Sequence, residues 1–216
     1  MIQIKKLTFN PFQENTYILF DETKECVIID PGCYTKDEQQ QLLNFIKDNG
    51  LKPVKLLNTH CHIDHVLGNY FVSQTFNLEL GIHKDDLVTL NSVSTYCHLY
   101  GFDAYQLSPE PAYFLNEGDK ITFGNSELDV IFCPGHAPGH VVFYNKNQQF
   151  VINGDVLFQG SFGRVDLPGG DFATLKHSIT TKMFALPDEV VVYTGHGGET
   201  TIGTEKVYNP ILSYEG

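Results

Sequence analysis

Three histidines and one aspartate fall within six residues of the stretch LLNTHCHIDHVLGN, which extends from Leu56 to Asn69. Side chains of these types are common ligands of Zn, Fe and Mn ions, and they rarely gather for packing reasons. The cluster also follows directly after an apolar run, VKLLN, that is typical of a buried strand. We therefore predict a metal site that includes four residues: His60, His62, Asp64 and His65.

Three more residues able to bind metal stand just after other apolar runs. The run LDVIFCPG leads to His136, the run FVING leads to Asp155, and the run VVVYTG leads to His196. Strand ends at one edge of a sheet are close in space, and α/β sheets usually carry their sites there. We therefore expect all seven side chains to meet at one sheet edge.

Seven ligands exceed the number that one four-coordinate ion needs, so they favour a pair of ions. Asp155 is the natural shared ligand, because a carboxylate has two oxygens and can bridge. Imidazole with carboxylate predicts two divalent ions, with Zn preferred and Fe or Mn as alternatives. Cys61 lies between two proposed ligands, and on an extended segment it would point away from His60 and His62, so it is excluded.

The other histidines receive a different interpretation. His83, His98 and His177 are interpreted as ordinary surface or core residues. His140 follows His136 by four residues, and it could either bind metal or brace the loop after His136.

The elements that must position these residues follow an α/β rhythm. Apolar runs predict strands, and Thr35 with Glu38 predicts a capping box that opens a helix ending at Gly50. The other predicted helices are 66–76, 171–186 and 204–212, and the predicted strands are 2–9, 14–20, 25–30, 54–58, 78–83, 119–123, 126–133, 140–145, 149–154 and 189–196. This order predicts an α/β sandwich.

The composition predicts one globular domain over residues 1–216, because 42% of the residues are hydrophobic and no linker interrupts the pattern. Residues 91–116 are rich in aromatic side chains and break the rhythm. We interpret this segment as an insert, either a loop or short helices, that lies over the active-site face.

Charge and cysteine content exclude several classes of protein. The formal charge of -12 and the absence of a basic patch argue against a nucleic-acid partner. No apolar run approaches the ~18 residues of a membrane span, and the first residues show no secretory signal. Five cysteines without a C-x-x-C pair fit a reducing cytoplasm. We expect a cytoplasmic protein that acts on a small molecule, and we make no prediction of oligomeric state.

The motifs THCHIDH, PGHAPGH, NGDVLF and TGHG together resemble the metallo-β-lactamase superfamily, and within it the short bacterial form of glyoxalase II. The resemblance covers nearly the whole chain and implies an αββα sandwich with metals at one edge. It implies two ligand sets that share Asp155: His60, His62 and His136 for one ion, and Asp64, His65 and His196 for the other. True β-lactamases commonly carry cysteine where this chain has Asp155, which argues against antibiotic hydrolysis.

Such a site predicts a hydrolase. Two cations roughly 3.5–4 Å apart can hold a bridging hydroxide, because they lower the pKa of water toward ~7. A thiolate leaves without a strong general acid, since a thiol has a pKa of ~8.5. We therefore predict hydrolysis of a small thioester such as S-lactoylglutathione, and Asp64 is the candidate catalytic residue that moves the proton.

Arg164 is the candidate substrate-binding residue. It lies in the glycine-rich stretch FQGSFGRVDLPGG that follows Asp155, and its guanidinium could fork onto a substrate carboxylate. The resemblance implies that a basic residue at this place grips the glutathione part of the substrate. The alternative is a structural pair between Arg164 and Asp166.

Four other functions compete with thioester hydrolysis. Persulfide dioxygenases share the H-x-H-x-D-H pattern and the GR-x-D stretch, but they use a single iron held by two histidines and one aspartate. A nuclease is disfavoured by the short, acidic chain, and a lactamase is disfavoured by Asp155. A non-enzymatic metal-binding or partner-binding module is disfavoured by the complete ligand set.

Overall fold

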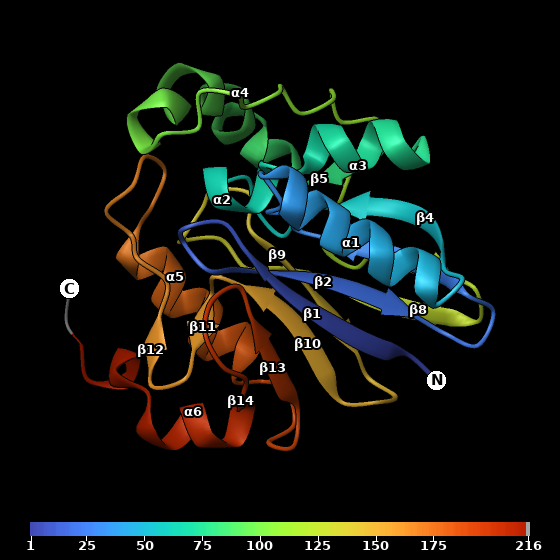
Figure 1. Ribbon diagram of the computed structural model, residues 1–216. Coiled ribbons are helices and arrows are strands. Elements are labelled where there is room, and N and C mark those ends of the chain that lie inside the picture. The colour runs from blue at the N-terminus through green and yellow to red at the C-terminus, as the bar shows by residue number, and fades with distance from the viewer. Residues whose placement is uncertain (215–216) are drawn as a thin grey trace.

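Two six-stranded β-sheets pack face to face in the computed structural model, which describes residues 1–214 (Figure 1). The first sheet has the order β1 (Gln3–Phe9), β2 (Glu14–Phe20), β3 (Glu25–Ile29), β4 (Lys52–Leu57), β5 (Leu80–Ile82) and β6 (Tyr113–Phe114). The second has the order β14 (Thr200–Thr201), β13 (Val191–Thr194), β10 (Phe150–Gly154), β9 (Val141–Asn145), β8 (Ser126–Phe132) and β7 (Lys120–Phe123). Residues 215–216, the end of the predicted domain, lie outside the described residues.

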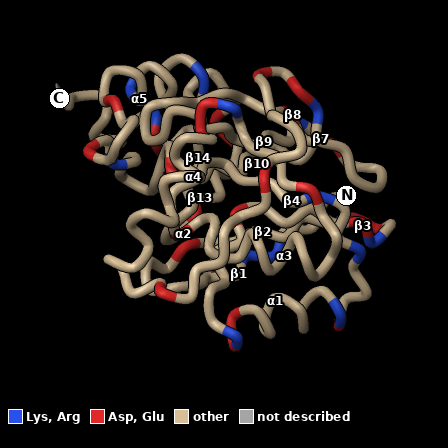
Figure 2. The backbone as a smooth tube through the Cα atoms, turned by 90° about the horizontal axis from the view of Figure 1, so that it is seen from above, with Lys and Arg blue, Asp and Glu red and all other residues tan. Residues whose placement is uncertain are grey.

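Helices cover the outer face of each sheet. Seen from above, α1 and α3 lie on the side of the first sheet, and α5 lies on the opposite side, beyond β9 and β10 (Figure 2). The helices of the first half are α1 (Lys36–Asp48), α2 (Ile63–Val66), α3 (Asn69–Phe76) and α4 (Leu87–Tyr96), with short 3-10 turns at Lys84–Asp86 and Cys97–Tyr100. Those of the second half are α5 (Phe172–Ser178) and α6 (Ile202–Tyr208). The αββα sandwich is therefore confirmed.

Three apolar layers stabilise the sandwich: one lies between the two sheets, and one lies between each sheet and its helices. Successive side chains of a strand point to opposite faces, so one strand contributes to two of these layers. On β2, Leu19 points into the layer between the sheets, whereas Ile18 points out toward α1. On β9, Phe143 joins the layer between the sheets, and Val142 packs against the helices of the second half. All four side chains are fully buried, so β2 and β9 each contribute side chains to two apolar layers.

The capping box of the first helix is present as predicted. The Thr35 hydroxyl accepts a hydrogen bond from the backbone N–H of Glu38, and the Glu38 carboxylate accepts one from the backbone N–H of Thr35. Two backbone groups that the helix cannot pair itself are satisfied in this way.

The prediction of one helix over 66–76 is wrong at its start. A helical turn, α2, already begins at Ile63 inside the histidine motif, and the chain then bends before α3. Gly68 allows the bend: its N–H donates to the Pro31 oxygen at 2.7 Å, and a Cβ at this position would collide with that oxygen and with Cys33. The bend brings the motif against the loop that follows β3.

The predicted helix over 171–186 is also interrupted. Asp171 caps α5 through the N–H of Thr174, but the helix widens into a π-turn at Ile179–Met183. The hydroxyls of Thr180 and Thr181 donate to carbonyl oxygens four residues back, a contact that loosens helical geometry.

The aromatic segment 91–116 contains more regular structure than a loop. Its first residues form the second half of α4, which begins earlier, at Leu87. Near its end, β6 adds a parallel strand to β5. The predicted boundary at 91 is therefore four residues inside a helix.

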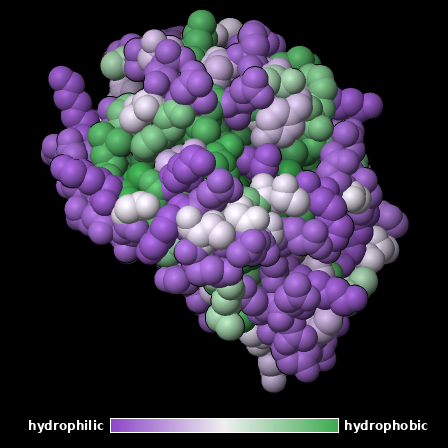
Figure 3. Space-filling model, turned by 90° about the vertical axis from the view of Figure 1, so that its right-hand side faces the viewer, coloured by the Kyte–Doolittle hydropathy of each residue, from purple (hydrophilic) through white to green (hydrophobic). Residues whose placement is uncertain are grey.

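The surface of the described residues mixes charge and apolar side chains. Lys and Arg positions are interspersed among the Asp and Glu positions in Figure 2, and the face in Figure 3 is mainly hydrophilic with apolar side chains gathered in its upper half. Among residues 1–214, no helix has the length and apolar character needed to cross a bilayer.

Candidate metal centre

Three histidines from both sheets form a buried group. His60 and His62 follow β4 of the first sheet, and His136 follows β8 of the second. One ring nitrogen of each lies within 4.8 Å of the others. The closest pair is His62 Nδ1 and His136 Nε2, at 2.9 Å. These side chains are at most 8% exposed, so their nitrogens have little access to solvent.

A second group stands beside the first. Asp64 and His65 lie on α2, and His196 follows β13. One ligand atom of each lies within 4.8 Å of the others. His196 Nε2 is 3.1 Å from Asp64 Oδ2, and His65 Nε2 is 3.7 Å from the same oxygen.

Asp155 connects the two groups. Its Oδ2 lies 3.6 Å from His136 Nε2 in the first group and 3.4 Å from His196 Nε2 in the second. Its Oδ1 lies 3.5 Å from His65 Nε2. One carboxylate therefore faces ligand atoms of both groups, and the structure brings all seven predicted side chains together.

Unpaired atoms at this place fit bound cations. His60 Nε2, His65 Nε2 and Asp155 Oδ1 are buried, and none has a hydrogen-bond partner among the described residues. A buried polar atom without a partner costs about 1–3 kcal/mol, so such atoms are few in a folded protein. Three of them facing one small space are what a site of imidazole and carboxylate ligands requires for a divalent metal.

In four of the five imidazoles, one ring nitrogen is held by an oxygen. His60 Nδ1 lies 3.0 Å from the Thr59 hydroxyl, and His65 Nδ1 lies 3.2 Å from Asp30 Oδ2. Backbone oxygens do the same elsewhere: His136 Nδ1 contacts the Arg164 oxygen at 2.7 Å, and His196 Nδ1 contacts the Phe12 oxygen at 3.0 Å. Such partners fix the orientation and tautomer of a metal-binding histidine.

Protonation differs between the two groups. Burial and neighbouring histidines hold the pKa of His60 well below its usual value, and they lower the pKa of His62 to about 3. Burial also lowers the pKa of His136. The first group is therefore neutral at pH 7 and ready to bind a cation.

The second group carries charge. Burial disfavours the charged imidazoles, but Asp64 and Asp155 outweigh it, so the pKa of His65 is raised well above its usual value. Burial opposes the charge on His196 as well, yet the same two carboxylates raise its pKa to about 10. Burial would raise the pKa of Asp155, but His65 and the other imidazoles outweigh it and hold that pKa well below the usual value.

Asp30 supports the site and was not predicted to do so. Its Oδ1 accepts from the Thr59 N–H at 2.7 Å, and its Oδ2 accepts from the Thr59 hydroxyl at 2.6 Å. Asp30 is also close enough to His60 and His65 to form a third potential ligand group with them. Because both its oxygens are occupied by Thr59 and His65, we assign it to orientation of the histidines. Its place at the strand end IIDPG was the signal in the sequence.

Asp86 ties together the two loops that carry the first group. Its Oδ2 accepts from the Cys61 N–H at 2.5 Å, and its Oδ1 accepts from the Gly139 N–H at 3.0 Å. The side chain is fully buried, and burial raises its pKa to about 6. Nothing in the sequence singled out Asp86, because its partners are backbone groups from distant segments.

His140 braces the site. Its Nε2 accepts a hydrogen bond from the Asp155 N–H at 3.1 Å, and its ring stacks on His60 with 4.6 Å between centroids. Cys61 is fully buried in the core on the α1 side, away from the ligand atoms. His83 stacks on Phe132 outside the cluster.

A cavity of about 1110 Å³ opens above the seven side chains. His62, Asp64, His136, Asp155 and His196 are among the residues at its floor. One wall comes from α4 and the turn after it, which includes Leu99 and Tyr100. Another wall comes from the segment after β10, including Phe158, Phe162, Arg164 and Leu167.

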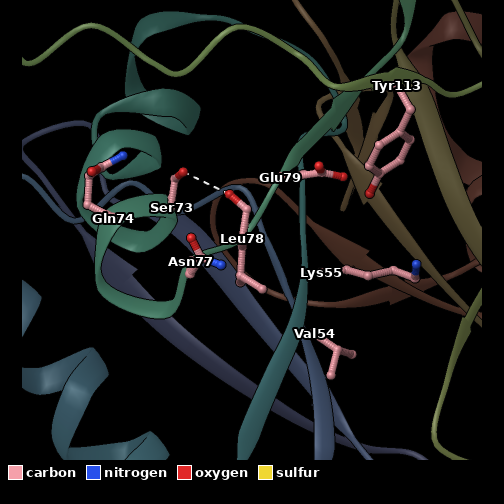
Figure 4. A pocket seen from close by; sticks show the side chains of 8 residues that line it. All are labelled: Val54, Lys55, Ser73, Gln74, Asn77, Leu78, Glu79 and Tyr113. Atoms are coloured by element: carbon pink, nitrogen blue, oxygen red, sulfur yellow. Dashed lines mark hydrogen bonds between the residues drawn. The ribbon is translucent and has the colours of Figure 1, made fainter.

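A smaller, polar cavity of about 410 Å³ lies at the opposite end of the first sheet (Figure 4). Val54 and Lys55 lie before the end of β4, and Leu78 and Glu79 precede β5, which runs parallel to β4. It contains none of the seven candidate ligands, so it is separate from the metal centre.

Arg164 is paired in this structure. Its Nε and one terminal nitrogen each donate to a different oxygen of Asp166 at 2.7 Å. The hydrogen bonds from Arg164 hold the pKa of Asp166 at about 2, so the partner is ionised. The structural pair that the sequence left open is therefore present at the surface, where both side chains are more than half exposed. Arg164 also lines the cavity.

The chain belongs to the metallo-beta-lactamase superfamily, whose family model matches residues 9–196. It is 37% identical to the probable metallo-hydrolase YqgX of Bacillus subtilis (strain 168), over 97% of each chain. It is 34% identical to the hydroxyacylglutathione hydrolase GloC of Haemophilus influenzae, over 98% of this chain and 99% of that protein. The resemblance to this superfamily is therefore confirmed.

Two further matches bear on the metal and the reaction. The crystal structure of TTHA1623 in a di-iron-bound form has a TM-score of 0.86 and 37% identity, covering 96% of this chain and 100% of that chain. The mitochondrial persulfide dioxygenase ETHE1 of Mus musculus is 34% identical over 92% of this chain and 71% of its own length. Together, the fold and the cluster of histidines and aspartates indicate a divalent-metal site.

Proposed function

We propose that this protein is a dinuclear metallohydrolase that cleaves small thioesters, for which S-lactoylglutathione is the first substrate to test. The observation that carries the proposal is the position of Asp155, whose oxygens lie 3.4–3.6 Å from imidazole nitrogens of both ligand groups. A single-ion site would need only one of these groups. The match to GloC over nearly the whole chain supports the choice of a thioester.

The residues have separate tasks in this proposal. His60, His62 and His136 hold one cation, Asp64, His65 and His196 hold the other, and Asp155 faces both. Two bound divalent cations supply an activated water and a Lewis acid for the acyl oxygen. Zn is the first choice, and Fe or Mn suits the same ligands.

The reaction balances with one water molecule. A C–O bond forms at the acyl carbon, the C–S bond breaks, and its electron pair leaves with sulfur. Asp64 would accept the proton of the attacking water through the carboxylate oxygen that does not hold the cation, because its side chain lies at the cavity floor. The departing thiolate needs little protonation, since a thiol has a pKa of ~8.5.

Metal titration tests the dinuclear assignment. Protein stripped with a chelator should gain thioesterase activity that saturates at about two equivalents of Zn. His196→Ala should lower this to about one bound ion and lose most of the turnover. His177→Gln is the matched control, because His177 is an exposed histidine on α5 and should keep both ions.

The role of Asp64 needs its own variant. Asp64→Asn keeps one oxygen but removes the proton acceptor, and we expect turnover to fall about 10²–10⁴-fold. Bound metal measured in the same sample separates the two roles of this residue. Unchanged turnover with both ions present would remove Asp64 from the proton path.

A mononuclear-iron persulfide dioxygenase is the second candidate, and the identity to ETHE1 favours it. It predicts one iron per chain and oxygen uptake with glutathione persulfide. Equal metal loading at both groups and no oxygen uptake would decide for the hydrolase.

A further inference from the structure

The outer wall of the cavity is apolar and carries no charge. Residues 87–102, which form α4 and the turn after it, contain no Lys, Arg, Asp or Glu. Val88 and Leu99 are nonetheless 79% and 74% exposed, and Tyr100 is 51% exposed. Exposed apolar side chains that gather beside a cavity, with no charged residue among them, indicate a binding surface.

This surface continues across the mouth of the cavity. Phe12, from the loop before β2, contacts Tyr100 edge to face with ring centroids 5.7 Å apart. On the other wall, Phe158 and Phe162 lie on the short strands β11 (Leu157–Phe158) and β12 (Ser161–Phe162). A molecule that reaches the candidate ligands at the floor of the cavity therefore passes between these aromatic side chains.

Apart from the two cations proposed for its floor, the cavity offers little electrostatic attraction to an anionic substrate. Arg164 is the one Lys or Arg among the lining residues described, and two of its three nitrogens donate to Asp166. Asp166 therefore competes with a substrate carboxylate for the Arg164 guanidinium. The formal charge of the whole chain is -12, which repels anions at long range.

We propose that the site selects thioesters whose acyl chain is apolar and uncharged, with that chain seated against Val88, Leu99 and Tyr100. This inference rests on the proposed thioesterase function and narrows it to hydrophobic acyl groups. The thiol part contributes little recognition, so a free carboxylate on the thiol gives no advantage.

Four thioesters test the proposal on the metal-loaded protein. They combine an acetyl or a hexanoyl group with either glutathione or the neutral thiol N-acetylcysteamine. Each methylene that becomes buried should raise kcat/KM by about two- to fourfold, so hexanoyl should exceed acetyl at least tenfold on both thiols. Glutathione and N-acetylcysteamine should differ by less than threefold.

Variants of Leu99 and Val88 test whether the preference for a longer acyl chain arises from the wall formed by α4 and the turn after it. Leu99→Gln and Val88→Gln should raise KM for the hexanoyl substrates about three- to tenfold. Val207→Gln is the matched control, because Val207 is 65% exposed on α6 and does not line the cavity. Asp166→Asn should release Arg164 and lower KM for the glutathione thioesters several-fold, with no change for the N-acetylcysteamine thioesters.

Binding gives a readout that does not depend on turnover. The hexyl thioether of N-acetylcysteamine cannot be hydrolysed, and by calorimetry it should bind chelator-treated protein at least tenfold more tightly than the methyl thioether. Equal binding of the two, or thioester hydrolysis that favours glutathione regardless of acyl length, would overturn this inference and leave the proposed function standing. No hydrolysis of any thioester by protein loaded with two ions would overturn both.

Discussion

At the scale of single residues, the two ligand groups differ in charge although their side chains are alike. The imidazoles of His60, His62 and His136 are neutral because they are buried among one another. Those of His65 and His196 are charged because they face two carboxylates. The histidines of the first group can therefore bind a metal ion directly, whereas those of the second group must first lose a proton.

Proton release should therefore accompany only one of the two binding steps. Imidazole must lose its proton to bind a cation, so the second group, in which the pKa values of the two imidazoles are raised, should release protons at pH 7.5. Its affinity should increase with pH up to about 10, the pKa of His196, whereas affinity at the first group should change little above pH 7. Calorimetry in buffers of different ionisation enthalpy measures the protons released. Equal release at both steps would contradict the assignment.

Asp30 provides a second test at this scale. Asp30→Asn keeps an oxygen for one partner but places an amide where Thr59 or His65 now donates. Loss of such an orienting group typically weakens metal binding or activity 10–100-fold. Competition with a chromogenic chelator measures the affinity. Asp37→Asn, at an exposed position of α1, is the control and should bind metal normally.

The seven ligands were predictable because each follows an apolar strand and each is of a metal-binding type. Among the supporting residues, only His140 was given a bracing role as one of two alternatives, because the partners of Asp30 and Asp86 come from remote segments. Asp30 stands at the strand end IIDPG, which was a usable signal, whereas nothing in the sequence singled out Asp86. The partners of Asp86 are set by tertiary packing, so its function could not be read from a local pattern.

At the scale of elements, the loops after the strands are held together by close backbone contacts. The Gly195 N–H donates to the Gly154 oxygen at 2.7 Å, which joins the ends of β13 and β10. The Asn15 N–H donates to the Gly195 oxygen at 2.7 Å, which joins the second sheet to β2 of the first. The loop carrying His196 is therefore fixed from both sheets.

Gly195→Ala should disturb the site by steric collision of the added methyl group. A Cβ at this position would collide with Asp155 Oδ1 and stand 2.9 Å from the His65 ring. We expect the loss of at least one ion per chain, with the far-UV circular dichroism unchanged. Gly198→Ala is the matched control, because its nearest atom, on Gln159, is 3.8 Å away. Full metal content in Gly195→Ala would mean that the loop can shift without cost.

Asp86→Asn should destabilise the fold as well as the site. Its two oxygens accept from two backbone N–H groups, and an amide would leave one donor facing another. The cost should be about 1–3 kcal/mol, measured by urea unfolding of chelator-treated protein. Asp85→Asn, at an exposed neighbour, should cost far less.

The pH dependence of the same variant has a definite sign. Burial raises the pKa of Asp86 to about 6 in the folded state, so between about pH 4 and 6 the folded chain holds a proton that the unfolded chain has lost. This group therefore makes the free energy of unfolding fall as pH rises through that window. The Asn variant should lack that part of the slope.

Element boundaries were less predictable than element types. The helix over 66–76 splits because Gly68 approaches Pro31, a contact between segments that the periodicity of either one cannot indicate. The strands missed by the prediction, β6, β11, β12 and β14, are two residues long and have no pattern to detect.

At the scale of the whole molecule, the fold does not depend on the metals for its core. Three apolar layers hold the two sheets and their helices, and the αββα arrangement was predictable from the strand order and the motifs. Bound cations would connect the two sheets in addition to the apolar layers, because His60 and His62 follow a strand of one sheet and His136 follows a strand of the other.

Metal removal should thus lower stability without unfolding the protein. A ligand present at 100 times its Kd stabilises the folded state by about 2.7 kcal/mol. Chelator-treated protein should keep its far-UV circular dichroism and lose several degrees of Tm, which scanning calorimetry measures. A collapse of secondary structure on chelation would show instead that the apolar layers alone are insufficient.

The order of the ligands along the chain has a consequence for synthesis. His60 to His65 leave the ribosome early, but Asp155 and His196 emerge only after most of the second sheet has been made. A nascent chain thus presents imidazoles without the carboxylate that both cations would share, and it can hold an ion only loosely. Stable loading should therefore wait until translation has passed His196, when the two halves of the sandwich close on each other.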